Sequence, residues 1–169
     1  QHIGSNVLDE NIFIQAMKAL LLSARRFANL EFLDFGGGFG VAYAPGEKSL
    51  AIDSLGPKIS TLVGNFCTEY GRPLTLSFEP GRYLVAEAGY LLATVTDRKE
   101  RESRIFIGVD SGFNHLIRPA MYGSYHEVVN LSHPNAQREK ANICGNVCES
   151  GDIFARDREL PRAEIGDIL

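Results

Sequence analysis

The stretch LEFLDFGGGFG, residues 30–40, places four glycines directly after a short apolar run. The apolar run has the length of a buried strand, and the glycines follow where that strand would end. Between Asp9 and Asn29, apolar residues recur at spacings of three and four, which predicts a helix with Asp9 as its N-cap. The sequence therefore predicts a helix, a strand and a glycine loop, in that order.

The same order occurs a second time. Apolar residues from Leu55 to Tyr70 have helical spacing, and Gly71 stands where a helix C-cap belongs. The strand-like run LTLSF, residues 74–78, then leads into EPGR at 79–82. Because strands that alternate with helices are typical of parallel sheets with helical crossovers, we predict a doubly wound sheet or part of a β/α barrel.

The pattern changes after residue 88. Short β-type runs are separated by charged residues or by Gly, Asn and Asp, with no long helical stretch among them; the runs are YLLATVTD, SRIFIGVD, YHEVVNLS, ANICG, GDIFARD and GDIL. The charged residues 96–103 are interpreted as a solvated hairpin tip. We therefore predict two domains, an α/β domain over 1–88 and a mostly antiparallel β domain over 89–169.

Composition narrows the classes of protein. The chain has 21 acidic and 17 basic residues and a net charge of -4, so no basic surface points to nucleic acid. No apolar run approaches the ~20 residues that span a bilayer, and no signal peptide is visible, so we predict a cytoplasmic protein without a membrane partner. The chain opens on QHIGSN without Met and stops at EIGDIL, which resembles the start of a strand; we expect a piece of a longer protein.

The three cysteines, Cys67, Cys144 and Cys148, are too few and too irregularly spaced for a disulfide framework. Cys144 and Cys148 form a CxxxC pattern, but no second pair and no nearby His accompany it. We therefore expect no metal site.

The glycine run has three interpretations. Gly36 and Gly38 match the first positions of a dinucleotide fingerprint, but Val41 stands where the third Gly or Ala is required. A P-loop is excluded because no Gly-Lys-Ser/Thr follows. A plain turn needs one or two glycines rather than three in a row. We favour a nest of backbone N–H groups for a phosphate.

EPGR occupies the equivalent place after the next strand. Two glycine loops on adjacent strand ends can bind one phosphate from two sides, as the loops after the last strands of a β/α barrel commonly do. Arg82 would add positive charge, and Glu79 at the strand end could address a ring nitrogen. Taken alone, Pro-Gly is usually only a turn, so the assignment depends on the pairing with residues 36–38.

Three further stretches carry candidate residues that are weak when taken singly. HIGS supplies His2 and Ser5, which are as typical of a surface His and a helix cap. In NHLIRPAMYGSYHEV, Arg118 and Tyr122 suit a carboxylate, although a surface ion pair explains the Arg equally well. CESGD joins a thiol to a carboxylate, which is more typical of a ligand loop than of a strand interior.

Together and in this order, five stretches resemble the fold-type III pyridoxal-phosphate (PLP) decarboxylases: HIGS, LDFGGGFG, EPGRYLVAEAG, VDSGFNHLIRPAMYGSYHEV and CESGDIFARDRELP. The motifs cover the chain nearly end to end, and their order is far more specific than any one of them. The resemblance implies the C-terminal part of a PLP-binding (β/α)8 barrel followed by a β domain, which agrees with the change of pattern near residue 88.

The resemblance also implies a role for each candidate. His2 would stack on the cofactor ring and Ser5 would bind its phosphate. Glu79 would pair with the pyridinium nitrogen and keep it protonated, so that the ring accepts electrons. Cys148 and Glu149 would reach the active site of the partner in a homodimer, where Cys148 supplies a proton and Glu149 recognises the distal end of the substrate. The remaining implied ligands are Gly36, Gly37, Gly38 and Gly81 for the phosphate, Arg118 and Tyr122 for the substrate carboxylate, and Arg82 for both.

The pattern CESGD with IRPAMYGSY implies meso-diaminopimelate as the substrate, decarboxylated to L-lysine in lysine biosynthesis. Ornithine, arginine or a carboxylated polyamine are alternatives on the same fold, and a non-catalytic partner-binding homologue or an NAD-binding module are alternatives of other classes. The family's cofactor-carrying lysine precedes HIGS, and a tyrosine that contacts the phosphate follows Leu169. Lys140 only copies the lysine motif by coincidence, so we expect the chain alone to be inactive.

Overall fold

All of residues 1–169 are described by the computed structural model, and they separate into two units. The first unit comprises Gln1–Ala42 and Gly46–Gly89, and the second comprises Tyr43–Pro45 and Tyr90–Leu169.

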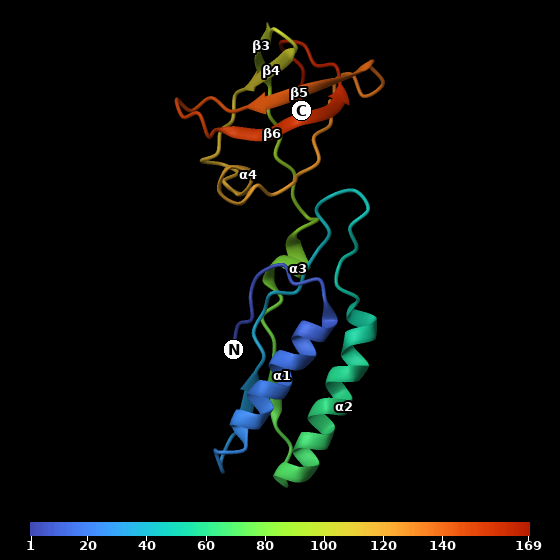
Figure 1. Cartoon of the computed structure of the whole chain (residues 1–169), viewed down its shortest axis with the longest axis vertical. Helices are drawn as coiled ribbons and strands as arrows, with labels where there is room; N and C mark the ends of the chain where they lie inside the picture. The colour runs from blue at the N-terminus through green and yellow to red at the C-terminus, as the bar shows by residue number, and fades with distance from the viewer. The chain divides into compact units, whose positions relative to one another are not determined.

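The first unit has alternating helices and parallel strands (Figure 1). Strand β1 (Phe32–Asp34) pairs in parallel with β2 (Thr75–Ser77), with Leu33 opposite Leu76. Helices α1 (Glu10–Ala24) and α2 (Ile52–Tyr70) lie side by side, and the short α3 (Gly81–Val85) follows β2. None of the chain's helices combines the length and apolar character that a membrane crossing requires. The predicted α/β order is confirmed.

The helix ends explain why these elements form where they do. The Asp9 carboxylate accepts a hydrogen bond from the Asn11 N–H at 2.8 Å, which caps α1 as predicted. Gly71 ends α2 with a φ of 80°, a left-handed conformation in which glycine pays no steric penalty. The apolar faces of the two helices and β1 share one buried core, made of Met17, Leu21, Ala24, Leu33, Phe35, Val63 and Phe66.

The first helix is shorter than its apolar pattern predicts. It ends at Ala24, and Phe27, which the pattern placed on the buried face, is 59% exposed. The Tyr70 hydroxyl donates to the Phe27 carbonyl and accepts from the Leu30 N–H at 3.1 Å. These bonds satisfy loop backbone groups that a longer helix would have paired internally, so the chain can leave the helix early.

The second unit contains one four-stranded sheet in the order β3-β4-β5-β6 (Figure 1). Its strands are β3 (Val95–Arg101), β4 (Arg104–Val109), β5 (Arg138–Cys144) and β6 (Ile153–Pro161), and the short helix α4 (Arg118–Tyr122) lies between β4 and β5 in the sequence. The outer pairings are antiparallel and β4–β5 is parallel, so the prediction of a mostly antiparallel β domain is confirmed. Its core contains Val95, Ile107, Val109, Ala141, Ile143 and Leu160.

Two details of the predicted β domain are wrong. The run YHEVVNLS forms no strand, and its polar groups pair with the rest of the unit in other ways. Arg158 donates to the His126 carbonyl at 2.8 Å, and the side chain of the fully buried Asn130, within the run, donates to the Arg162 carbonyl at 2.9 Å. Only Glu102 and Ser103 of the charged run form the hairpin tip, since residues 96–101 belong to β3. Arg98 is only 9% exposed and is paired with Glu139 on β5 at 2.6 Å.

Candidate functional site

The glycine loop after β1 is packed against two other segments of backbone. A side chain at Gly37 would overlap the carbonyl oxygen of Glu79, and one at Gly38 would overlap that of Gly4. Gly38 also has a φ of +90°, which non-glycine residues rarely adopt. The loop therefore requires glycine for close backbone approach, a reason that is separate from any ligand.

Hydrogen bonds join the same segments. The Val7 N–H donates to the Gly38 carbonyl at 2.8 Å, and the Glu79 N–H donates to the Gly36 carbonyl at 2.9 Å. The Gly36 N–H is used within the loop, where it donates to Asp34 Oδ1 at 2.7 Å. No hydrogen bond within the chain uses the N–H of Gly37 or of Gly38. The loop thus offers two backbone donors in succession, which is the arrangement that binds an anion.

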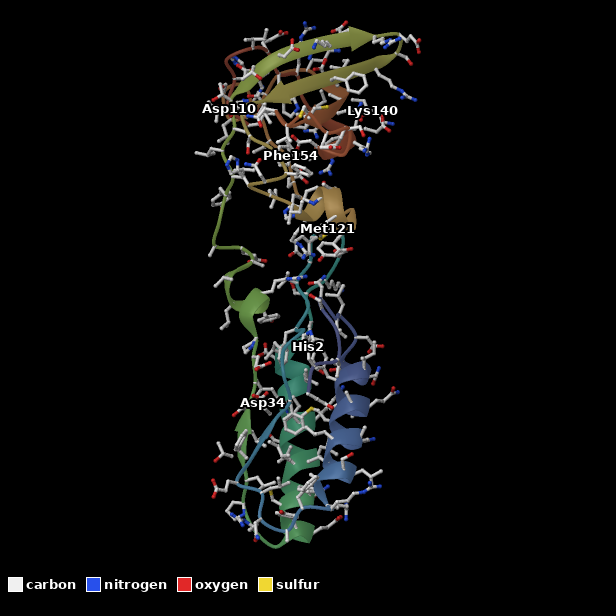
Figure 2. All side chains as sticks on the ribbon, turned by 90° about the vertical axis from the view of Figure 1, so that its left-hand side faces the viewer. His2, Asp34, Asp110, Met121, Lys140 and Phe154 are labelled. Carbon is white, nitrogen blue, oxygen red and sulfur yellow. The ribbon has the colours of Figure 1, made fainter.

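A pocket of about 220 Å³ lies between these segments in the first unit. Seven of the eight predicted cofactor ligands line it, namely His2, Ser5, Gly37, Gly38, Glu79, Gly81 and Arg82. The eighth, Gly36, is buried and is absent from the pocket wall. Figure 2 labels His2 and Asp34, which marks the end of β1 just before the glycines. The fold therefore brings together residues from three separate parts of the sequence.

Arg82 and Ser5 meet at this pocket. The Arg82 Nη2 donates to Ser5 Oγ at 2.8 Å. Because this bond occupies a lone pair of the hydroxyl oxygen, the Ser5 O–H remains available to donate to another acceptor. A guanidinium, a hydroxyl and two backbone N–H groups form a donor set that suits a phosphate. Glu79, whose side chain is exposed, adds a carboxylate at the same pocket.

The guanidinium of Arg118, in the second unit, packs against two aromatic rings. Its guanidinium carbon lies 5.2 Å from the ring centre of Tyr122 and 5.7 Å from that of Tyr43. Its Nη2 donates to Ser124 Oγ at 3.2 Å, while its Nε is buried without a hydrogen-bond partner in the chain. Cation–π contacts restrain the side chain without using its N–H groups. Arg118 therefore keeps donors for a carboxylate, the ligand predicted for it.

His126 is a neighbour of this arginine that the sequence did not single out. Its ring packs edge-to-face on Tyr43, with centroids 5.4 Å apart, and its Nε2 is buried without a partner. Burial, together with the charges of Arg118 and Arg158, lowers the pKa of His126 below its ordinary value. A lone His within YGSYHEV gives no sequence signal that distinguishes it from a surface residue.

We expect the lowered pKa of His126 to make the stability of the second unit depend on pH. Because the unfolded chain binds the proton more readily than the folded one, stability is full above pH 6.5, the ordinary His value, and falls as the pH drops through the lowered pKa. Urea unfolding from about pH 7.5 to about pH 5 should show this loss, and His126→Gln should flatten it. An unchanged slope in His126→Gln would contradict the assignment.

Asp152, which the sequence analysis did not single out, supports the loop that carries Cys148 and Glu149. It is 3% exposed, and its two carboxylate oxygens accept the N–H groups of Phe113 at 2.7 Å and Val147 at 2.8 Å. Its backbone carbonyl accepts a hydrogen bond from the Gly145 N–H at 2.9 Å. Cys148 and Glu149 are themselves exposed. The buried carboxylate therefore fixes the base of a loop whose tip presents a thiol and an acid.

The three cysteines should differ in reactivity. Cys148 is exposed, whereas Cys67 and Cys144 are half-buried, and burial raises the pKa of the Cys144 thiol. Since the thiolate is the reactive form, iodoacetamide should modify Cys148 first. Peptide mass spectrometry over a time course measures the order; faster labelling of Cys144 would show that the loop is not arranged as described.

Two family descriptions match the chain. The pyridoxal binding domain of pyridoxal-dependent decarboxylases matches residues 1–86, and the C-terminal sheet domain of the same family matches residues 48–169. The chain belongs to the pyridoxal-dependent decarboxylases. The predicted cofactor, pyridoxal 5'-phosphate, and the predicted fold class are confirmed by this membership.

Individual relatives agree with the family. The diaminopimelate decarboxylase of Methanothermobacter thermautotrophicus is 48% identical over 99% of this chain and 41% of the relative, and that of Campylobacter jejuni is 36% identical over 99% and 41%. A diaminopimelate decarboxylase structure from M. jannaschii in complex with L-lysine has a TM-score of 0.85 at 36% identity, covering 99% of this chain and 39% of that one. The chain thus spans about two fifths of the length of its curated relatives.

Lys140 belongs to the second unit. It lies exposed on β5 of the second unit, opposite Glu159 on β6 (Figure 2). The pocket in the first unit is lined by no lysine. The interpretation of the Lys-Ala-Asn sequence as a coincidence stays a prediction.

Proposed function

We propose that the full-length protein is a PLP-dependent carboxy-lyase that converts meso-diaminopimelate to L-lysine and CO2. The observation that carries this proposal is the pocket of the first unit. It combines four hydrogen-bond donors suited to a phosphate with the carboxylate of Glu79. Curated diaminopimelate decarboxylases that are 34–48% identical over 99% of the chain support the choice of substrate. The lysine that carries the cofactor would lie in a segment before Gln1, so the chain alone should not catalyse the reaction.

Each cofactor ligand has a distinct role in this proposal. Ser5, Arg82 and the backbone N–H groups of Gly37 and Gly38 would bind the phosphate. The N–H groups of Gly81 and Gly36 donate within the chain, to the Glu79 carbonyl at 2.9 Å and to Asp34 Oδ1 at 2.7 Å, so these two glycines would shape the loops around the phosphate. His2 would pack on the face of the ring and keep water from it. Glu79 would hold the proton on the ring nitrogen. The chemistry that bound PLP would supply is an electron-accepting ring for the pair released as CO2 leaves, and a protonated ring nitrogen strengthens it.

The second unit would bind the substrate. Arg118 and Tyr122 would bind and orient a substrate carboxylate, and Arg82 of the first unit is assigned a carboxylate ligand as well. Cys148 delivers the proton that replaces the lost carboxylate, and Glu149 binds the distal ammonium group. We place Cys148 and Glu149, which are both exposed, at the partner's active site in a homodimer.

The organisation and location of the protein complete the proposal. We assign residues 1–88 to part of the PLP-binding barrel and residues 89–169 to part of the sheet domain. We also place the enzyme in the cytoplasm, where an amino-acid biosynthetic reaction has its substrate; cell fractionation with an antibody against the chain tests that location.

A substrate comparison tests the proposed reaction. The full-length protein with PLP is incubated with meso-diaminopimelate, L-lysine, L-ornithine, L-arginine and a carboxylated polyamine, and CO2 release is measured. Meso-diaminopimelate carries both an amine and a carboxylate at its far end. We expect its kcat/KM to exceed the others by at least about 100-fold, since a site that pairs both groups rejects analogues that lack one. Preference for another amino acid reassigns the substrate. PLP binding without CO2 release from any of them would indicate a non-catalytic homologue.

A further inference from the structure

Asn6 directly follows Ser5 and lines the pocket, yet no role follows for it from the motifs. Its backbone has a φ of 58°, in the left-handed region that most residues avoid. Asparagine adopts this conformation more readily than other non-glycine residues. The position therefore selects for a small set of residues, of which asparagine is the one that also brings a side-chain amide.

The Asn6 amide pairs with both main-chain groups of a single distant residue. Its Oδ1 accepts from the Val41 N–H at 2.9 Å, and its Nδ2 donates to the Val41 carbonyl at 3.2 Å. Next to this pair, the backbone of Val7 donates to the Gly38 carbonyl at 2.8 Å and accepts from the Gly40 N–H at 3.0 Å. The side chain thus extends a short ladder between the two segments, as a strand residue would.

These hydrogen bonds join the segment that carries Ser5 to the segment that carries Gly37 and Gly38, the proposed phosphate ligands. Ser5 precedes Asn6 on one side, and Gly37 and Gly38 precede Val41 on the other. Ser5 is tied further to Arg82 at 2.8 Å. If the ladder loosened, the Ser5 hydroxyl and the glycine N–H groups would separate, while each segment would keep its own local structure.

We propose that Asn6 is a positioning residue for the phosphate of the cofactor, which sets the spacing between the Ser5 hydroxyl and the N–H groups of Gly37 and Gly38. This inference rests on the proposed function, because it takes PLP as the ligand. It assigns no contact between Asn6 and the substrate. A positioning role affects only the binding of the phosphate group, whereas a general loss of stability would weaken every ligand alike.

Asn6→Gly separates the amide from the backbone conformation, since glycine keeps the left-handed φ and removes the two hydrogen bonds. The dissociation constants of the full-length protein are measured for PLP and for pyridoxal, which lacks the phosphate, by absorbance titration. We expect Asn6→Gly to weaken PLP about tenfold and pyridoxal by less than about twofold. Asn11→Ala, which removes an exposed amide that contacts Asp9, is the matched control and should change neither.

Asn6→Asp is a second variant for the case that Asn6→Gly fails to fold. The readout is again the loss of PLP affinity compared with the loss of pyridoxal affinity. Asn6→Asp keeps the acceptor for the Val41 N–H and places an acceptor against the Val41 carbonyl, so it should also weaken PLP more than pyridoxal. Equal weakening of the two ligands, or no weakening of either, would overturn the proposal. A wild-type protein that binds neither ligand would refute the proposed function, and this inference with it.

Discussion

Gly37→Ala should lower the affinity of the full-length protein for PLP by about 10- to 100-fold and destabilise the first unit by about 1–3 kcal/mol. The added methyl group would overlap the Glu79 carbonyl oxygen, a backbone atom that cannot turn away. The segment 79–82 must then move from the glycine loop, and Glu79, Gly81 and Arg82 move with it. Urea unfolding and PLP titration measure the two effects.

Gly64→Ala is the matched control for this prediction. Gly64 is exposed in the middle of α2, and a side chain there would meet nothing within 4 Å. We expect it to stabilise the protein by roughly 0.5–1 kcal/mol, because alanine loses less backbone entropy than glycine in a helix. If Gly37→Ala were as stable as Gly64→Ala and bound PLP normally, the close packing of the loop against Glu79 would be wrong.

Cys148→Ala should reduce kcat of the full-length enzyme by about 10²- to 10⁴-fold, the range for a positioned proton donor. KM should change much less, because the thiol supplies a proton and the proposed carboxylate ligands, Arg118 and Tyr122, remain. Steady-state rates of CO2 and L-lysine formation over a range of meso-diaminopimelate concentrations separate the two constants.

Cys144→Ala provides the comparison, since Cys144 lies at the end of β5 and has no role in the proposed reaction. It should retain kcat within about threefold. A Cys148→Ala enzyme with a kcat equally close to wild type would assign the proton transfer to another group and leave Cys148 a surface residue.

Much of the fold was predictable because its signals are local. The cap at Asp9, the left-handed Gly71 and the helical spacing between Leu55 and Tyr70 are each read within a few residues. The glycines at 36–38 and the EPGR stretch at 79–82 pointed to one site, since neighbouring parallel strands end at the same edge. Five of the predicted ligands, namely Gly37, Gly38, Glu79, Gly81 and Arg82, line one pocket for that reason, while His2 and Ser5 reach it from the N-terminal segment.

The residues that the sequence did not reveal act through partners far along the chain. Asn6 pairs with a residue 35 positions away, and the Asp152 carboxylate binds an N–H 39 positions away. No periodicity records such contacts. The segment 125–132 was misassigned as a strand for a related reason. Its β-type composition was visible, whereas the distant partners of His126 and Asn130, which are Arg158 and Arg162, were not.

We propose that the pocket between Ser5, the glycine loop and Arg82 binds the phosphate of PLP. A crystal structure of the full-length protein grown with PLP shows where the phosphate lies. We expect phosphate oxygens within about 3 Å of the N–H groups of Gly37 and Gly38 and of Ser5 Oγ, with Glu79 beside the ring nitrogen. A phosphate bound elsewhere, or a ring nitrogen paired with a group other than Glu79, would contradict it.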